Sequence, residues 1–112
     1  MTALAPEDAK LVTLARATRA RTAADHGAAV RDLDGRTYAG ASVHLPGVLR
    51  LTALEVCVAM AISSGSKGLE AAVVLGGDTV ASDLALLRAF APDALHWRGD
   101  PAGRNLEAVV DE

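Results

Sequence analysis

Apolar side chains recur at helical spacing over the first quarter of the chain. They stand at i, i+3, i+4 and i+7, the pattern of an amphipathic helix, and are Leu11, Leu14, Ala15 and Thr18. A proline followed by two acids, at 6–8, is typical of a helix start. We therefore expect a first helix that begins at Pro6 and ends near Asp25.

Two extended runs, 27–33 and 36–43, follow this helix, and Asp34-Gly35 separates them. An Asp-Gly pair between extended runs predicts a β-hairpin with a type I′ turn, in which both corner residues have positive φ. Many residues of the two runs are small, so another element is expected to pack closely on the hairpin. Residues 44–47 are expected to break the second strand and to lead into a helix.

The most apolar stretch of the chain is the predicted helix 51–62. Its residues 53–62 comprise nine apolar side chains and one charge, Glu55. A helix without a polar face is expected to be covered by protein all round. Thr52 and Glu55 have the spacing of a capping box, in which each side chain binds a free backbone amide of the other residue. Glu55 can therefore be a cap or a catalytic acid.

The second half of the chain predicts alternating strands and helices. The nearly continuous apolar run 69–75 is typical of a strand buried on both faces, usually parallel to its neighbours. The other expected elements are a helix capped by Ser82 or Asp83 and ended by Pro92, a strand at 94–97, a turn at 100–103 and a last helical turn capped by Asn105. This order of elements predicts a layered α/β domain.

Length and composition indicate one globular domain spanning residues 1–112. The net charge of -3 argues against nucleic-acid partners. Membrane association is not expected either, since no apolar run reaches the roughly 18 residues that span a bilayer. Cys57, the only cysteine, is expected to be a core residue, and the first eight residues do not resemble a signal peptide, so a cytoplasmic protein is expected.

Two glycine-containing loops are candidate phosphate sites. The loop 65–68 follows a helix and precedes a strand, which is the reverse of the order that a phosphate-binding loop needs. The loop 76–79 has the right order and could bind an anion at the next helix, but a simple turn is the expected use.

Residues 27–62 resemble the N-terminal half of a cytidine deaminase, without a gap. Gly27-Ala28-Ala29-Val30 resembles the family's first strand, and 34–40 resembles its hairpin and second strand. Glu55 falls on the glutamate of the family's Cys/His-Ala-Glu motif. Further on, 90–93 and 100–104 resemble the end of the family's next helix and a late turn. The resemblance implies a three-layer α/β/α domain with a mixed sheet of four to five strands.

The same resemblance implies a zinc site whose ligands this chain lacks. The family holds zinc through three side chains, and the metal acidifies a water while the glutamate shuttles a proton. The three ligand positions correspond to Ala53, Val80 and Asp83. The family's Asn-x-Glu, which holds the ribose, corresponds to Ser42 and His44. We therefore expect no zinc and no other cofactor.

A ligand pocket is still expected where the family has its active site. Its predicted residues are Ser42, His44, Ala53, Glu55, Val80 and Asp83. A substitute metal site made by His44, Asp83 and Glu55 is a less favoured alternative. His26 and His96 are expected to be surface or packed histidines.

Two functions from different classes follow. The favoured one is a zinc-free relative that binds a small nucleoside-like ligand or assembles as a homodimer or homotetramer, since an alanine-rich core with three aromatic residues favours burial between subunits. The alternative is an active cytidine or nucleoside deaminase, or a related hydrolase, with an unconventional site that uses Glu55.

Overall fold

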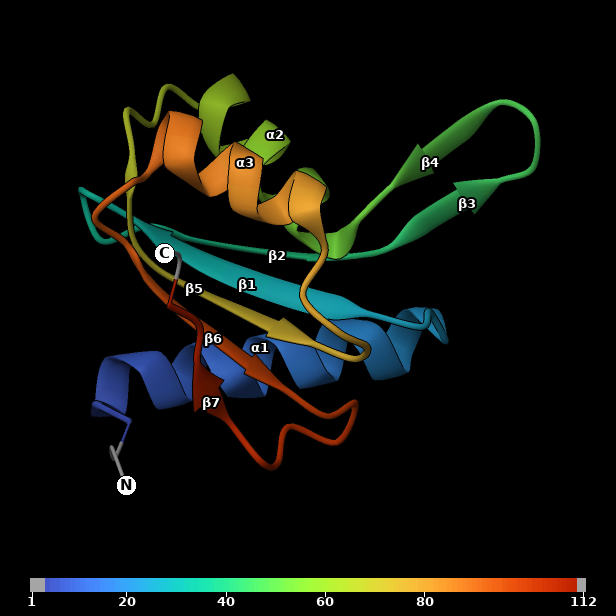
Figure 1. Cartoon of the computed structure of the whole chain (residues 1–112), viewed down its shortest axis with the longest axis horizontal. Helices are drawn as coiled ribbons and strands as arrows, with labels where there is room; N and C mark the ends of the chain where they lie inside the picture. The colour runs from blue at the N-terminus through green and yellow to red at the C-terminus, as the bar shows by residue number, and fades with distance from the viewer. Residues whose placement is uncertain (1–3, 111–112) are drawn as a thin grey trace.

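A five-stranded mixed sheet lies between two helical layers in the computed structural model, which describes residues 4–110 (Figure 1). The strand order is β2-β1-β5-β6-β7. The helices are α1 (Pro6–Thr22), α2 (Ala53–Ser63) and α3 (Ala81–Phe90). The strands are β1 (Gly27–Asp32), β2 (Thr37–Ala41), β3 (Val43–Leu45), β4 (Leu49–Leu51), β5 (Leu69–Leu75), β6 (Leu95–Gly99) and β7 (Glu107–Ala108). The predicted three-layer α/β/α fold is confirmed.

The single-domain prediction also covers residues 1–3 and 111–112, which lie outside the described residues. Between residues 4 and 110, no helix combines the length and the apolar character needed to cross a bilayer.

Alternation along the strands sends side chains to two separate cores. Ala28, Val30 and Val74 pack on the side of α2 and α3, while Ala29 and Val73 pack on the side of α1. This is the period of two expected for strands covered on both faces. The predicted strand 69–75 is confirmed as β5, but it is antiparallel to β1 and parallel only to β6.

Small residues bring α2 very close to the hairpin, as predicted. A Cβ placed on Gly40 of β2 would lie 2.7 Å from the Val56 Cγ1 atom of α2. A glycine is therefore needed at this point of the sheet.

The hairpin between β1 and β2 is confirmed, but the predicted type I′ turn is wrong. Among residues 33–36 only Gly35 has positive φ, at +84°. The Asp32 amide donates to the Arg36 carbonyl at 2.8 Å, which leaves a three-residue loop that ends in glycine. The Asp32 carboxylate selects this longer loop because it accepts hydrogen bonds from the amides of Asp34 and Arg36, both at 2.9 Å.

Residues 44–47 do not simply break the strand, as was predicted: residues 44–45 belong to β3, and residues 46–48 form the turn of a second hairpin. β3 and β4 pair with each other, with Val43 opposite Leu51 and Leu45 opposite Leu49. Gly47, with φ of +73°, supplies the left-handed residue of the turn. We call residues 43–51 the arm, because Figure 1 shows this hairpin standing away from the layered body.

Helix α2 begins at Ala53, directly after the N-cap of the predicted capping box, rather than at residue 51, which belongs to β4. A single chain does not cover this helix all round. Leu54, Cys57 and Val58 are buried, whereas Ala59 and Ile62 are exposed. Cys57 is a core residue, as predicted, and burial raises its pKa to about 12. The expectation of complete coverage is wrong for one copy of the chain.

Three other expectations about helices are also wrong. Helix α1 ends at Thr22 rather than near Asp25, and Leu14 on its predicted apolar face is exposed. The N-cap of α3 is Val80, whose side chain has no acceptor and makes no cap bond. The Asp83 carboxylate accepts a hydrogen bond from Thr52 and does not serve as the N-cap.

The predicted C-terminal helical turn is instead the short strand β7. Residues 107–108 pair antiparallel with β6, opposite Trp97 and Arg98. Asn105 takes a left-handed conformation, with φ of +57°, and turns the chain back to the sheet edge instead of capping a helix.

Candidate functional site

A cavity of about 240 Å³ opens where the arm meets the first turn of α2 and the loop before α3. This is roughly eight times the ~30 Å³ that a water molecule occupies in the liquid, and somewhat below the ~300–1,000 Å³ of drug-sized ligand sites. The cavity therefore has room for a small ligand.

The structure brings five of the six predicted pocket residues to this cavity. They are Ser42, His44, Ala53, Val80 and Asp83. Glu55 is not among the lining residues. Its Oε1 atom accepts a hydrogen bond from the Thr52 amide at 2.7 Å, and its own amide donates to the Thr52 Oγ1 at 3.0 Å. The predicted capping box is thus confirmed.

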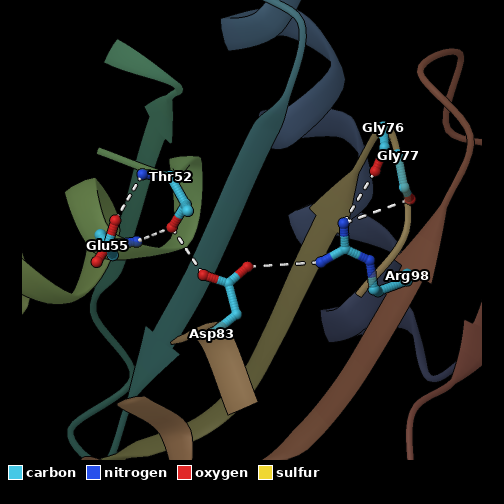
Figure 2. A network of polar contacts seen from close by, with 6 residues as sticks. All are labelled: Thr52, Glu55, Gly76, Gly77, Asp83 and Arg98. Atoms are coloured by element: carbon cyan, nitrogen blue, oxygen red, sulfur yellow. Dashed lines mark hydrogen bonds and ion pairs between the residues drawn. The ribbon is translucent and has the colours of Figure 1, made fainter. Parts of the chain in front are cut away.

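Thr52 connects this cap to Asp83 on α3. Besides accepting from the Glu55 amide, the Thr52 hydroxyl donates its proton to the Asp83 Oδ1 at 2.7 Å (Figure 2). Asp83 is 2% exposed. One hydroxyl therefore joins the N-terminus of α2 to a buried carboxylate on the neighbouring helix.

Arg98 completes the network from β6. Its Nη1 lies 3.5 Å from the Asp83 Oδ2, and its Nη2 donates to the carbonyls of Gly76 and Gly77 at 2.9 and 3.4 Å (Figure 2). Its Nε and Nη1 atoms are buried without a hydrogen-bond partner among the described residues. The Asp83–Arg98 ion pair thus lies beside the cavity, and the Arg98 Nε is a donor that no described residue uses.

Burial works against the charge of both members of this ion pair. It raises the pKa of Asp83 above its usual value, against the hydrogen bond from Thr52 and the charge of Arg98. It lowers the pKa of Arg98, against the nearby charges of Asp83 and Asp78. The Asp83 charge is therefore supported by the Thr52 hydroxyl and by Arg98, and the Arg98 charge chiefly by Asp83.

Further polar residues at the cavity were not predicted as site residues. They are Asp25, His26, Arg50, Thr52, Asp78 and Arg98. His26 was expected to be a surface or packed histidine. It is half-buried, lines the cavity and packs against the loop 76–77. A Cβ placed on Gly77 would lie 2.6 Å from the His26 Nε2. The loop 76–79 is the turn that was expected, in close contact with a histidine.

No sequence pattern indicated that Arg98 would line the cavity. Trp97 packs in the core on the α1 side, so the alternation of β6 sends its neighbours His96 and Arg98 to the opposite side of the sheet. The sequence predicted a strand only through residue 97, which left Arg98 outside it. Extending the strand by two residues would have pointed to Arg98.

A family model described as cytidine deaminase-like matches residues 4–103. The chain belongs to the cytidine deaminase-like family. The match covers most of the 112 residues and confirms the family that the residues around Glu55 indicated. No curated protein matches this chain in sequence.

Solved cytidine deaminases share the fold of this family member at low sequence identity. The enzyme of Mycobacterium leprae is 18% identical, with a TM-score of 0.72 and 94% of each chain covered. That of Burkholderia pseudomallei is 16% identical, with a TM-score of 0.78 and 90% of each chain covered. A variant of the Mycobacterium tuberculosis enzyme is 22% identical, with a TM-score of 0.69 over 79% of this chain and 82% of the other.

The residues at the family's zinc-ligand positions do not fit a zinc ion. Ala53 and Val80 carry no donor atom. Asp83 does, but one of its oxygens accepts the Thr52 proton and the other lies 3.5 Å from a guanidinium, whose positive charge opposes a cation. Among residues 4–110, no three His, Cys, Asp or Glu side chains gather into a possible metal site, so the alternative set of His44, Asp83 and Glu55 is not assembled either.

Proposed function

We propose that this chain is a zinc-free member of the cytidine deaminase-like family that binds a small nucleoside-like ligand without deaminating it. One observation carries the proposal. Asp83, the one ligand position that retains a donor group, is held between the Thr52 hydroxyl and the Arg98 guanidinium. Both oxygen atoms of the Asp83 carboxylate, which a metal would need as ligands, already contact other groups of the chain.

The position of Glu55 supports the loss of chemistry. In the family the corresponding glutamate moves a proton at the substrate, as the resemblance implies. Here the Glu55 carboxylate faces the backbone of Thr52 and does not line the cavity. The capping box gives this carboxylate a structural role at the start of α2.

The polar groups around the cavity support binding. Arg98 lines the cavity, and its buried Nε has no hydrogen-bond partner among residues 4–110, while its Nη1 is engaged by Asp83. Ser42 and His44 lie at the positions that correspond to the family's ribose contacts. Unpaired buried donors are costly, so a ligand that carries an acceptor would be stabilised by Arg98. The site therefore retains recognition while it lacks a metal and a proton shuttle.

Zinc analysis combined with a cytidine deamination assay tests the loss of chemistry. The chain, purified and then incubated with zinc and dialysed, should hold far less than one equivalent of zinc and should not convert cytidine to uridine. One equivalent of zinc together with cytidine turnover would contradict the proposal.

The alternative of an unconventional hydrolase predicts a different outcome for one variant. Glutamine is accepted in a capping box, so Glu55→Gln should preserve the helix cap while removing the proton-transfer group. If the parent chain hydrolyses a nucleoside and Glu55→Gln abolishes the reaction without lowering the melting temperature, Glu55 is catalytic and the binding-only proposal is wrong.

Thermal unfolding with a panel of nucleosides tests binding. A nucleoside present at 100 times its Kd should add ~2.7 kcal/mol to the free energy of unfolding. Val80→Phe, which places a larger side chain at the cavity, should remove the shift, whereas the matched surface change Val110→Phe should not. If no nucleoside raises the melting temperature of the parent chain, pocket binding is refuted.

A further inference from the structure

The arm has a polar face and an apolar face. His44 of β3 lies opposite Arg50 of β4, and the pairs on either side of them are apolar, Val43 with Leu51 and Leu45 with Leu49. Partners across a hairpin share one face, and successive pairs alternate between the two faces. His44 and Arg50 therefore lie together on the polar face, where the Arg50 Nη2 is 3.4 Å from the His44 Nε2.

This polar face carries a positive charge at the cavity that no carboxylate neutralises. His44 and Arg50 both line the cavity and are both exposed. No carboxylate of residues 4–110 lies within ion-pair distance of Arg50, and the polar partner of its guanidinium is the His44 ring. Arg50 is thus a cation at the cavity that has a second potential donor beside it and no counter-charge.

The other arginine at the cavity is placed in the opposite way. Arg98 lies 3.5 Å from the Asp83 carboxylate, and the charge of Asp78 also acts on it. The third lining carboxylate, that of Asp25, belongs to a segment that packs against the loop 76–77, since a Cβ placed on Gly76 would lie 2.7 Å from the Asp25 carbonyl oxygen. The carboxylates therefore belong to the layered body, and the unpaired cation belongs to the arm.

From this separation of charge we infer that the polar face of the arm binds a phosphate monoester, so that the ligand of the cavity carries its phosphate against His44 and Arg50. The inference rests on the proposed function, because it concerns the ligand of the same cavity. A guanidinium offers two parallel donors that match two oxygens of a phosphate. The neighbouring imidazole can donate to the third oxygen, which a carboxylate ligand would lack.

Exposure of the polar face suits a doubly charged group. A phosphate bound at the mouth of the cavity stays in contact with water, so it avoids most of the cost of burying its charge. The rest of the ligand then occupies the cavity of about 240 Å³ behind it.

The residue at position 44 agrees with this assignment. The resemblance places His44 at the glutamate of the family's Asn-x-Glu, which holds the ribose. A carboxylate at the cavity would repel a phosphate, whereas a histidine does not. This departure from the family therefore changes the local charge in the direction that Arg50 also favours.

Calorimetric titration of the full chain tests the phosphate site. The probes are cytidine, its 3′- and 5′-monophosphates, ribose 5-phosphate and inorganic phosphate. At low salt, at least one cytidine monophosphate should bind about tenfold more tightly than cytidine, as expected for added hydrogen bonds to a charged group. Arg50→Gln should bring the ratio of the two Kd values close to one, and Arg50→Lys should retain part of the preference.

Arg16→Gln is the matched control for the change of charge. Arg16 is exposed on α1, which covers the face of the sheet away from α2 and α3, and it does not line the cavity. This variant should keep the preference of the parent chain for the monophosphate. Circular dichroism checks that each variant is folded.

The two phosphate-bearing kinds of ligand are separated by ribose 5-phosphate. A Kd equal to that of the cytidine monophosphate would support the phosphate site with a sugar phosphate as the ligand, and much weaker binding would support it with a nucleotide. Inorganic phosphate that binds as tightly as the monophosphate would show an unselective anion site and overturn the inference.

Other outcomes distinguish failure of the phosphate site from failure of the proposed function. Equal Kd values for cytidine and both monophosphates would overturn the phosphate site and leave nucleoside binding intact. A monophosphate preference that Arg50→Gln leaves unchanged would overturn its assignment to the arm. Binding of none of the probes would overturn both proposals.

Salt provides a test that needs no variant. The Debye length falls from about 30 Å at 0.01 M to about 3 Å at 1 M ionic strength, so an exposed contact between phosphate and arginine is strongly screened. The preference for the monophosphate should therefore shrink over this range while the Kd of uncharged cytidine changes little. A preference that is independent of salt would contradict binding through Arg50.

Discussion

The buried network and the arm lie next to each other in sequence but are held in place in opposite ways. Thr52, the residue after the arm, is fixed by hydrogen bonds to Glu55 and Asp83. The arm that precedes it pairs only with itself and exposes its apolar side chains. Polar groups are thus concentrated inside and apolar groups outside at this junction. The comparison shows that a polar side chain can be buried in this fold when it has hydrogen-bond partners, so polarity alone does not decide which side chains are buried.

The largest effect is expected from breaking the ion pair on one side only. Arg98→Met leaves the Asp83 carboxylate, 2% exposed, without its counter-charge, and should lower the free energy of unfolding by about 3–5 kcal/mol at neutral pH. Urea denaturation measures this loss.

A second variant and a pH series distinguish this mechanism from simple loss of packing. Asp83→Asn combined with Arg98→Met removes both charges and should recover much of the stability. Burial raises the pKa of Asp83 in the folded chain, so the folded state holds the proton more tightly than the unfolded state. The Arg98→Met deficit should therefore be smallest below pH 3.8, the ordinary pKa of an aspartate, and grow as the pH rises through the pKa of Asp83 in the folded state. A deficit that does not vary with pH would contradict the charge explanation.

Thr52→Val removes the hydroxyl that serves both α2 and Asp83. Loss of an N-cap bond and of a bond to a buried carboxylate should together lower the free energy of unfolding by about 2 kcal/mol. Thr13→Val, at an exposed threonine of α1, is the matched control and should change it by less than about 0.5 kcal/mol. Equal losses of stability from the two changes would contradict the claim that the Thr52 hydroxyl stabilises both α2 and Asp83.

His96 makes the buried region sensitive to acid. It is 7% exposed, and burial, aided by the charge of Arg98, lowers its pKa from 6.5 to about 4. On acidification the unfolded chain is protonated first, so stability is lost as the pH falls from 6.5 towards 4. His96→Gln should lose less stability over this range than the parent chain. Thermal melts at pH 7 and pH 4.5 make the comparison.

The smallest effect on folding is expected in the arm. Val48→Ser should change the free energy of unfolding by no more than about 0.5 kcal/mol under conditions where the chain is monomeric, because this side chain is 77% exposed. Amides of the arm should also exchange hydrogen faster than those of α2. Protection of the arm equal to that of α2 in the monomer would refute the contrast between the two regions.

Local signals predicted most of the layered body. The capping box of Thr52 and Glu55 located the start of α2, and the apolar run 69–75 located the buried strand, because each signal lies within a few consecutive residues. The family resemblance added the arrangement of the layers. It also predicted that one pocket contains five residues that do line the cavity, namely Ser42, His44, Ala53, Val80 and Asp83.

What the sequence failed to predict depends on distant partners. The Asn105 signal for a helical cap was overruled when residues 107–108 paired with the edge of β6. Asp83 has the character of a helix cap, yet Thr52, 31 residues away, binds its side chain. Arg98 belongs to the site only because β6 lies beside β5. Contacts between residues that are distant in the sequence produce no local pattern of apolar and polar positions from which they could be predicted.

The buried ion pair also restricts how this protein can change by mutation. A change of Asp83 to a metal-binding cysteine leaves Arg98 without its carboxylate, and a change of Arg98 leaves Asp83 alone. Either intermediate would forfeit a large share of the roughly 5–15 kcal/mol that keeps an ordinary domain folded. A mutational route from this pocket towards a zinc site must therefore replace Asp83 and Arg98 together or pass through a sequence that barely folds. The pair thus opposes a stepwise substitution of a metal-binding cysteine at residue 83.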